Sequence, residues 1–191
     1  RMVNLHPVSP SDVHLDMIGN YGTPTPLLET EIEQIIERFA TTARIAKEGG
    51  FTGVQIHSAH GYLLSQFLSP ITNKRSDIWG GSIENRARLL LAVVRAVRDA
   101  VGPAFPIAVK LNSSDFQKGG FSHEDSVKVA RWLQEVGIDL LEVSGGTYEK
   151  TKFLTTEEED DVRESTKHRE AFFLEYAETM REAVGDLPLM V

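Results

Sequence analysis

The feature that most constrains the fold of this 191-residue chain is a repeated alternation of helix-like and strand-like segments. After Thr30, apolar residues recur at helical spacing, and Gly49 and Gly50 end that segment just before a short apolar run. The same order then repeats along the chain. The predicted helices are 30–48, about 83–101, 122–136 and about 168–184, and the predicted strands are 54–57, 107–112, 139–144 and 187–191. Strands that alternate with helices in this way are expected to be parallel, with helical crossovers.

Residues suited to helix capping mark where these helices should begin. Thr30 and Glu33 have the spacing of a capping box, so we place the first helix start at Thr30. Ser82 can cap the second helix, and Ser122 with Asp125 opens the third. Glycines mark the predicted ends of the later helices: Gly102, Gly137 and Gly185.

Alternate positions along the predicted strands differ in polarity. One face, called the polar face below, carries Gln55, His57, Ala108, Lys110, Asn112, Leu140, Glu142 and Ser144. The other carries Val54, Ile56, Ile107, Val109, Leu111, Leu141 and Val143. A sheet covered by helices on both sides should be apolar on both faces, and no GxGxxG motif follows any strand. We therefore predict an α/β fold of the TIM (β/α)8 barrel class, here a partial barrel of about four parallel strands.

The length of the chain sets the expected domain organisation. A complete eight-stranded barrel usually takes about 250 residues, and half a barrel leaves two unpaired sheet edges. We therefore expect residues 1–191 to be a single partial barrel domain, completed by the remainder of a longer protein or by another chain, as in a homo-oligomer. The proline-containing residues 1–28 are predicted to be an irregular loop that leads into the fold.

Composition narrows the class of partner. The net charge of −8 argues against a general nucleic-acid or acidic-membrane surface. No apolar run approaches the roughly 20 residues of a membrane span, and the first residues lack the apolar stretch of a signal peptide. The absence of cysteine excludes disulfides and thiolate chemistry. We expect no nucleic-acid partner and no membrane, and a cytoplasmic location fits this composition.

The segment HSAHGY at residues 57–62 concentrates proton-handling groups at the end of a predicted strand. His57 ends the strand, His60 follows three residues later, and Tyr62 comes directly after Gly61. Two imidazoles and a phenol provide hydrogen-bond donors and a proton source at one point. Because the carboxyl ends of barrel strands carry active sites, we interpret this segment as the active site.

The segments GFTGVQIHSAHGYLLSQFLSPITNKRSDIWGGSIENRARLL and IAVKLNSSDFQKGGFSHEDSVKVARWLQEVGIDLLEVSGG resemble the Old Yellow Enzyme family, the FMN-dependent NADH:flavin oxidoreductases and ene-reductases. The likeness covers nearly the whole chain, and its most specific part combines HxxHGYL with FLSP, GGS and ENR. It implies the central portion of a TIM barrel. It also implies FMN as cofactor, NADH or NADPH as electron source, and an α,β-unsaturated carbonyl compound as substrate.

The resemblance also implies roles for the residues of the HSAHGY segment. His57 and His60 look like the pair that hydrogen-bonds the carbonyl oxygen of an activated alkene. Tyr62 looks like the donor of a proton to the α-carbon, while hydride comes from reduced FMN. A phenol of ordinary pKa, about 10, is protonated at neutral pH and can act in this way.

Cofactor-binding roles follow from the same resemblance. Lys110 stands where many members have an arginine beside the flavin, so the charge is kept but the planar fork is lost. His57, Ser144 and Gly145 are the other residues expected to lie against the flavin. Taken from the residues alone, Lys110 could equally form an ion pair with Glu142, and Ser144 and Gly145 could form a plain turn.

Two alternatives remain open from the sequence. In the family, the FMN phosphate is held by strands that would follow Val191, so the chain could be a truncated, FMN-free and inactive structural module. The pair His57 and His60 could instead belong to a metal-dependent hydrolase. That reading lacks the helix and glutamate of HExxH and finds no third ligand, so we predict no metal site.

Overall fold

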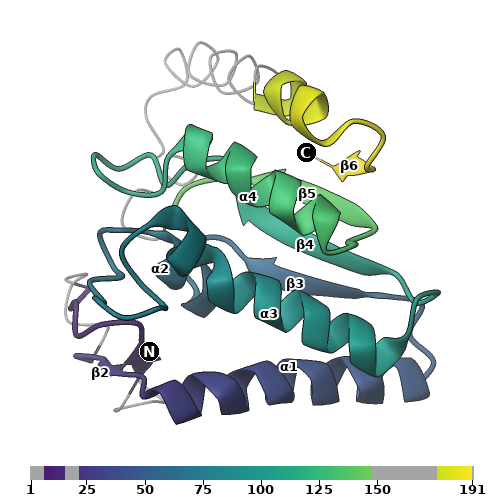
Figure 1. Cartoon of the computed structure of the whole chain (residues 1–191), viewed down its shortest axis with the longest axis horizontal. Helices are drawn as coiled ribbons and strands as arrows, with labels where there is room; N and C mark the ends of the chain where they lie inside the picture. Colours follow the sequence, from purple (N-terminus) through teal and green to yellow (C-terminus); the bar gives the residue numbers. More distant parts are fainter. Residues whose placement is uncertain (1–6, 16–21, 148–175, 191) are drawn as a thin grey trace, which may run out of the picture.

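The computed structural model describes residues 7–15, 22–147 and 176–190, and its centre is a parallel four-stranded sheet flanked by helices (Figure 1). The sheet contains β3 (Val54–Ser58), β4 (Ile107–Asn112), β5 (Leu140–Ser144) and β6 (Leu189–Met190). The helices are α1 (Glu29–Glu48), α2 (Leu63–Leu68), α3 (Ile83–Val101) and α4 (His123–Glu135), and residues 176–184 are also helical. Two short strands, β1 (Val8–Ser9) and β2 (Thr25–Pro26), pair with each other in parallel.

The strand order decides between the two α/β architectures. The strands lie in the order β3-β4-β5-β6, which is also their order in the sequence, and every pair is parallel. A doubly wound sheet would reverse its order at a switch point. In Figure 1, α3 and α4 lie in front of the strands, and α1 packs along α3. This arrangement is a segment of a (β/α) barrel wall, as the sequence predicted.

Burial separates the two faces of the sheet as the alternation of residues predicted. On the helix-covered face, Ile56, Val109 and Leu141 are almost completely buried, and they pack in one core with the apolar sides of α3 and α4. On the polar face, Gln55 is exposed while Lys110 and Glu142 are half-buried. Because each buried aliphatic side chain contributes about 1.5–3 kcal/mol, the helix-covered face holds the sheet together. The polar face is left available for chemistry.

The ends of α3 and α4 lie where their capping residues predicted them. The Ser82 hydroxyl accepts from the Asn85 N–H at 3.4 Å, and the Ser122 hydroxyl accepts from the Asp125 N–H at 3.2 Å. Gly102 follows α3 with a φ of +80°, a backbone conformation that glycine adopts without a steric cost.

The predicted start of α1, at Thr30, is one residue too late. The helix begins at Glu29, and the Glu31 carboxylate accepts from the backbone N–H of Leu28 at 2.7 Å. Thr30 and Glu33 therefore lie inside the first turns rather than forming a capping box. The acidic side chain of Glu31 satisfies the same kind of N-terminal donor and also favours the positive end of the helix dipole.

Three further differences concern the loops. Residues 1–28 were predicted to be irregular, but the described part contains the β1–β2 pair; residues 7–15 and 22–28 are called the leading segment below. The short helix α2 was not predicted, because four of its six residues are buried and no polar face gives it a helical period. The first part of the helix predicted at 168–184 lies outside the described residues, and the remainder is helical as expected.

Candidate active site

The chain reverses direction directly after β3 and thereby gathers the two histidines and the tyrosine. His60 has a φ of +61° and Gly61 a φ of +76°, two consecutive residues in the left-handed region. The imidazole of His57 lies 4.8 Å from the Tyr62 ring and 5.4 Å from the His60 ring, measured between centroids. The three groups predicted from the HSAHGY segment therefore form one cluster, and Tyr62 is 39% exposed.

Strand register places three charged or titratable residues side by side on the polar face. His57 is paired with Lys110, and Lys110 is paired with Glu142, in consecutive parallel strands. The Lys110 ammonium lies 2.7 Å from one Glu142 carboxylate oxygen, and the Gln55 amide donates to the other at 2.7 Å. The predicted ion pair between Lys110 and Glu142 is confirmed, so the cation beside His57 is already partly neutralised.

The end of β5 meets the turn after β3. The Nε2 atom of His60 lies 2.6 Å from the Ser144 hydroxyl, and the direction of this hydrogen bond depends on the imidazole tautomer. His60 also forms a parallel bridge with Thr147. At Gly145, an added Cβ would lie 2.7 Å from the Phe116 ring. Packing against Phe116 therefore explains the glycine at position 145 without reference to a ligand.

Burial and local charge change the protonation behaviour of the cluster. Burial first, and then the Lys110 charge, lower the pKa values of both His57 and His60, so both imidazoles are neutral at pH 7. Burial alone would raise the pKa of Glu142, but hydrogen bonds from Lys110 and Gln55 outweigh it, and the pKa is lowered. The site therefore presents neutral imidazoles beside an ionised pair.

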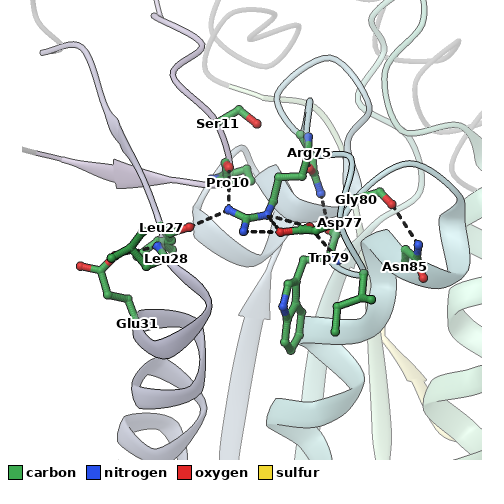
Figure 2. Close-up of polar contacts among 12 residues, drawn as sticks. Pro10, Ser11, Leu27, Leu28, Glu31, Arg75, Asp77, Trp79, Gly80 and Asn85 are labelled. Carbon is green, nitrogen blue, oxygen red and sulfur yellow. Dashed lines mark hydrogen bonds and ion pairs between the residues drawn. The ribbon is translucent and has the colours of Figure 1, made fainter.

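One arginine joins the loop after α2 to the leading segment (Figure 2). The Arg75 guanidinium donates to the carbonyl oxygens of Leu27 and Pro10, at 2.6 and 3.2 Å. It also forms an ion pair with Asp77 at 2.6 Å. A Cβ on Gly80 would lie 2.4 Å from the Arg75 carbonyl oxygen, so the close approach here requires glycine. These contacts give the loop a structural role.

A cavity of about 290 Å³ lies beside Tyr62. Its lining combines the leading segment, including Val8 and Val13, with Tyr62, Ile71 and Thr147. The surface that lines the cavity is mostly apolar, and Tyr62 is the residue that the cavity shares with the His57 cluster. The cavity is therefore a candidate for the apolar part of a ligand that reaches the cluster.

Two features are absent from the part of the chain that the structure describes. Within residues 7–15, 22–147 and 176–190, no group of three or more His, Cys, Asp or Glu side chains is arranged to hold a metal ion. Over the same residues, no helix is long and apolar enough to cross a membrane.

Residues 5–188 match the model of the NADH:flavin oxidoreductase / NADH oxidase family. The chain belongs to this family. One relative is an NADH-dependent flavin oxidoreductase of Aspergillus parasiticus, which is 40% identical over 176 residues that cover 90% of this chain and 38% of the relative. The family predicted from the HSAHGY region is confirmed, and the predicted cofactors, FMN with NADH or NADPH, are those of this flavin oxidoreductase family.

Solved structures of flavin oxidoreductases and related enzymes agree with the fold. A 2-naphthoyl-CoA reductase in complex with 2-naphthoyl-CoA matches with a TM-score of 0.84 and 31% identity, over 96% of this chain and 26% of that chain. An old yellow enzyme homologue from Zymomonas mobilis matches with a TM-score of 0.69 and 30% identity, over 84% of this chain and 48% of that chain. The predicted TIM-barrel class is confirmed. The chain spans less than half the length of each of these proteins.

Two residues near the cluster were not assigned a role from the sequence. Asn112 was expected only to lie on the polar face, yet it is almost completely buried and accepts from the His60 backbone N–H at 3.1 Å. Asp115, which follows it by three residues, is also buried and lines the cavity beside Tyr62. In the sequence they are only two polar residues after a strand; their burial, which makes hydrogen-bond partners necessary, is visible only in the structure.

Proposed function

We propose that this chain supplies part of the active site of an FMN-dependent NADH or NADPH oxidoreductase that reduces the C=C bond of α,β-unsaturated carbonyl compounds. The observation that carries the proposal is the cluster of His57, His60 and Tyr62 at the carboxyl end of β3, beside Lys110 in the neighbouring strand. Active sites of (β/α) barrels lie at this end of the strands.

The two imidazoles are assigned to the carbonyl oxygen of the substrate. Reduction at the β-carbon places negative charge on that oxygen, and neutral imidazole N–H groups can donate to it, as in an oxyanion hole. Hydrogen bonds to a charged group are worth about 1.5–3 kcal/mol each. The lowered pKa values of His57 and His60 keep both rings neutral at pH 7, which preserves them as hydrogen-bond donors without fixed charge.

Tyr62 is assigned as the proton donor to the α-carbon. Its ring contacts His57 and also lines the cavity, so one side chain is shared by the oxygen-binding groups and the space proposed for the rest of the substrate. General acids of this kind typically contribute about 10²–10⁴-fold to the rate. The cavity would receive the apolar portion of the substrate.

The residues on the polar face fit a flavin. The buried Nδ1 atom of His57 has no hydrogen-bond partner within the part of the chain that the structure describes, and Lys110 offers a half-buried cation beside it. When bound, FMN would supply the hydride. Lys110 would hold the flavin by its charge, with His57, Ser144 and the backbone of Gly145 at the same edge of the sheet.

Support for the substrate class comes from a structural neighbour. The 2-naphthoyl-CoA bound in that reductase is a carbonyl compound conjugated to carbon–carbon double bonds. A compound of that electronic type meets the requirement of the site for an oxygen that gains charge while a C=C bond is reduced. The predominantly apolar lining of the cavity suits a hydrophobic substituent on such a compound.

The experiment is reconstitution of the chain with FMN, followed by removal of free flavin and by anaerobic assay with NADH, NADPH and 2-cyclohexen-1-one. We expect retained flavin absorption and loss of the alkene, with Tyr62→Phe slowing protonation by about 10²-fold or more and leaving flavin retention unchanged. His123→Gln, in α4 on the helix-covered side, is the matched control for His60→Gln.

One observation favours a second candidate, an FMN-free structural module. Lys110 is already paired with Glu142 at 2.7 Å, and any flavin contact has to compete with that pair. If the chain retains no flavin, and Glu142→Gln does not restore retention, the structural module becomes the better description. Flavin retention with no alkene reduction by either nicotinamide would contradict the assignment of His57, His60 and Tyr62.

A further inference from the structure

The backbone of His60 is held in a conformation that residues with side chains rarely adopt. Its φ of +61° lies in the left-handed region, where the Cβ of a non-glycine residue crowds the backbone. The following Gly61 has a φ of +76° without that crowding. A strained residue at the centre of a site persists only when its surroundings fix it. The contacts of the His60 backbone are therefore expected to determine the position of its imidazole.

One buried amide supplies that contact. The Asn112 Oδ1 atom accepts from the His60 backbone N–H at 3.1 Å. The Asn112 Nδ2 atom donates to a carboxylate oxygen of Asp115 at 3.1 Å and to the carbonyl oxygen of Gly146 at 3.0 Å. The carboxylate and the carbonyl only accept here, and the backbone N–H only donates. These partners fix which end of the amide faces His60, since a flipped amide would lose all three bonds.

The position of Asn112 in the sheet lets its amide contact the loops on both sides. It is the last residue of β4, the strand between β3 and β5. Through His60 it holds the turn after β3, and through Gly146 it holds the turn after β5. The imidazole of His60 then meets Ser144 at 2.6 Å across the same gap. A single side chain on the middle strand therefore sets the spacing of the two loops that carry the site.

Asp115 keeps this amide in place. Its second carboxylate oxygen accepts from the Phe121 backbone N–H at 2.9 Å, and both Asn112 and Asp115 are 1% exposed. The Ser126 hydroxyl donates to the Asn112 carbonyl oxygen at 2.7 Å, which ties the end of β4 to α4. Because both polar side chains are almost fully buried, losing a partner would leave groups without water to replace it.

We propose that Asn112 is a positioning residue for the reaction: it holds His60 in its left-handed conformation so that the imidazole faces the substrate oxygen, and Asp115 orients the Asn112 amide. The inference rests on the proposed function, in which His60 contacts the substrate. Asn112 itself acts only through His60 and Gly146. A displacement of about 1 Å at a reacting group can cost about 10²-fold in rate.

The chain offers a closely matched control. Asn73 is also buried, and its Nδ2 atom donates to the carbonyl oxygens of Phe67 and Trp79 at 2.7 and 2.8 Å. Its Oδ1 atom accepts from the Arg75 N–H at 3.1 Å. Asn73→Ala and Asn112→Ala therefore remove the same number of hydrogen bonds, and they differ in that one partner of Asn112 is the Asp115 carboxylate. Only Asn112 contacts His60.

The test follows the titration of His60 by NMR of the full chain labelled at histidine, with His60→Gln to assign the signal. Burial is the main cause of the lowered His60 pKa, followed by the charges of Lys110 and His57 and opposed by Glu142. In Asn112→Ala we expect that pKa to rise toward 6.5 as the ring leaves its site, while Asn73→Ala leaves it unchanged. If Asn112→Ala does not fold, Asp115→Asn serves instead, with a smaller rise expected.

An unchanged His60 titration in a folded Asn112→Ala or Asp115→Asn chain would overturn the inference, and so would an equal change in Asn73→Ala. A second readout separates it from the proposed function. In the flavin-loaded chain, Asn112→Ala should lower the rate of alkene reduction up to about 100-fold. His60→Gln should lower that rate as well. If His60→Gln leaves that rate intact while Asn112→Ala still moves the His60 pKa, the proposed function fails and the positioning role stands.

Discussion

Replacing Arg75 by methionine should destabilise the chain, because it removes the group that joins the leading segment to the loop after α2 (Figure 2). The guanidinium donates to two carbonyl oxygens of the leading segment, on Leu27 and Pro10, and pairs with Asp77. Methionine keeps much of the length and apolar contact of the side chain but none of these donors. The variant therefore isolates the polar contacts from the packing of the stem.

The two kinds of contact differ in expected magnitude. A hydrogen bond from a charged donor contributes about 1.5–3 kcal/mol, so the two carbonyl contacts together should be worth about 3–6 kcal/mol. The ion pair should contribute only about 0–1 kcal/mol, because the Asp77 side chain is 45% exposed whereas that of Arg75 is 12% exposed. Against a typical free energy of unfolding of about 5–15 kcal/mol, the loss in Arg75→Met is large.

Urea unfolding followed by circular dichroism measures the difference. Asp77→Asn removes the charge but keeps an oxygen that can accept from the Trp79 N–H, and we expect it to cost less than about 1 kcal/mol. Arg95→Met, at an exposed position of α3, controls for the loss of an arginine. The cost of Asp77→Asn should shrink in high salt, while that of Arg75→Met should largely remain. If Arg75→Met costs no more than Asp77→Asn, the carbonyl contacts do not anchor the leading segment and the reasoning fails.

Three further predictions test the packing, the capping and the protonation of the same region. Gly145→Ala should lower the urea midpoint by an amount equivalent to about 1–3 kcal/mol, since the new methyl would overlap the Phe116 ring. An unchanged midpoint would mean that the loop can move to accommodate the methyl group without a loss of stability. Ser82→Ala should cost about 1 kcal/mol in thermal unfolding through loss of the α3 cap, and a cost equal to zero would assign the helix start to packing alone. The stability of the chain should fall as the pH drops below 6.5, because the lowered pKa values of His57 and His60 let the unfolded state take up protons that the folded state does not. The double variant His57→Gln, His60→Gln should flatten the urea midpoint against pH in that window, and an unaltered slope would contradict the pKa directions.

Much of the fold could be predicted because its signals are local. The helical spacing of the apolar residues Leu90, Val94 and Val97 predicted α3, and all three side chains are buried as expected. The alternation along β4 gave its two faces. By contrast, α2 carries no polar face, and the start of α1 depends on which nearby glutamate reaches back to a free N–H. Short elements and cap choices depend on contacts that a periodic pattern does not contain.

The candidate site divides in the same way. The clustering of His57, His60 and Tyr62 follows from their closeness in the sequence at the end of a strand. The pairing of Lys110 with Glu142 needed the register of two strands, and it was open until that register was known. The contacts of Asn112 with His60 and Gly146 could not be predicted from the sequence, because these partners lie in the turns after two other strands.

The sequence by itself determined the alternation of strands and helices, the apolar and polar faces of the sheet, and the family to which the HSAHGY segment belongs. These properties depend on side-chain period and on residues that are neighbours in the chain. Only the tertiary structure decided that Lys110 is paired with Glu142, that Arg75 holds the leading segment, and that one amide joins the two loops of the site. Such contacts are made between residues tens of positions apart, and they exist only after hydrophobic burial has brought the parallel strands into register.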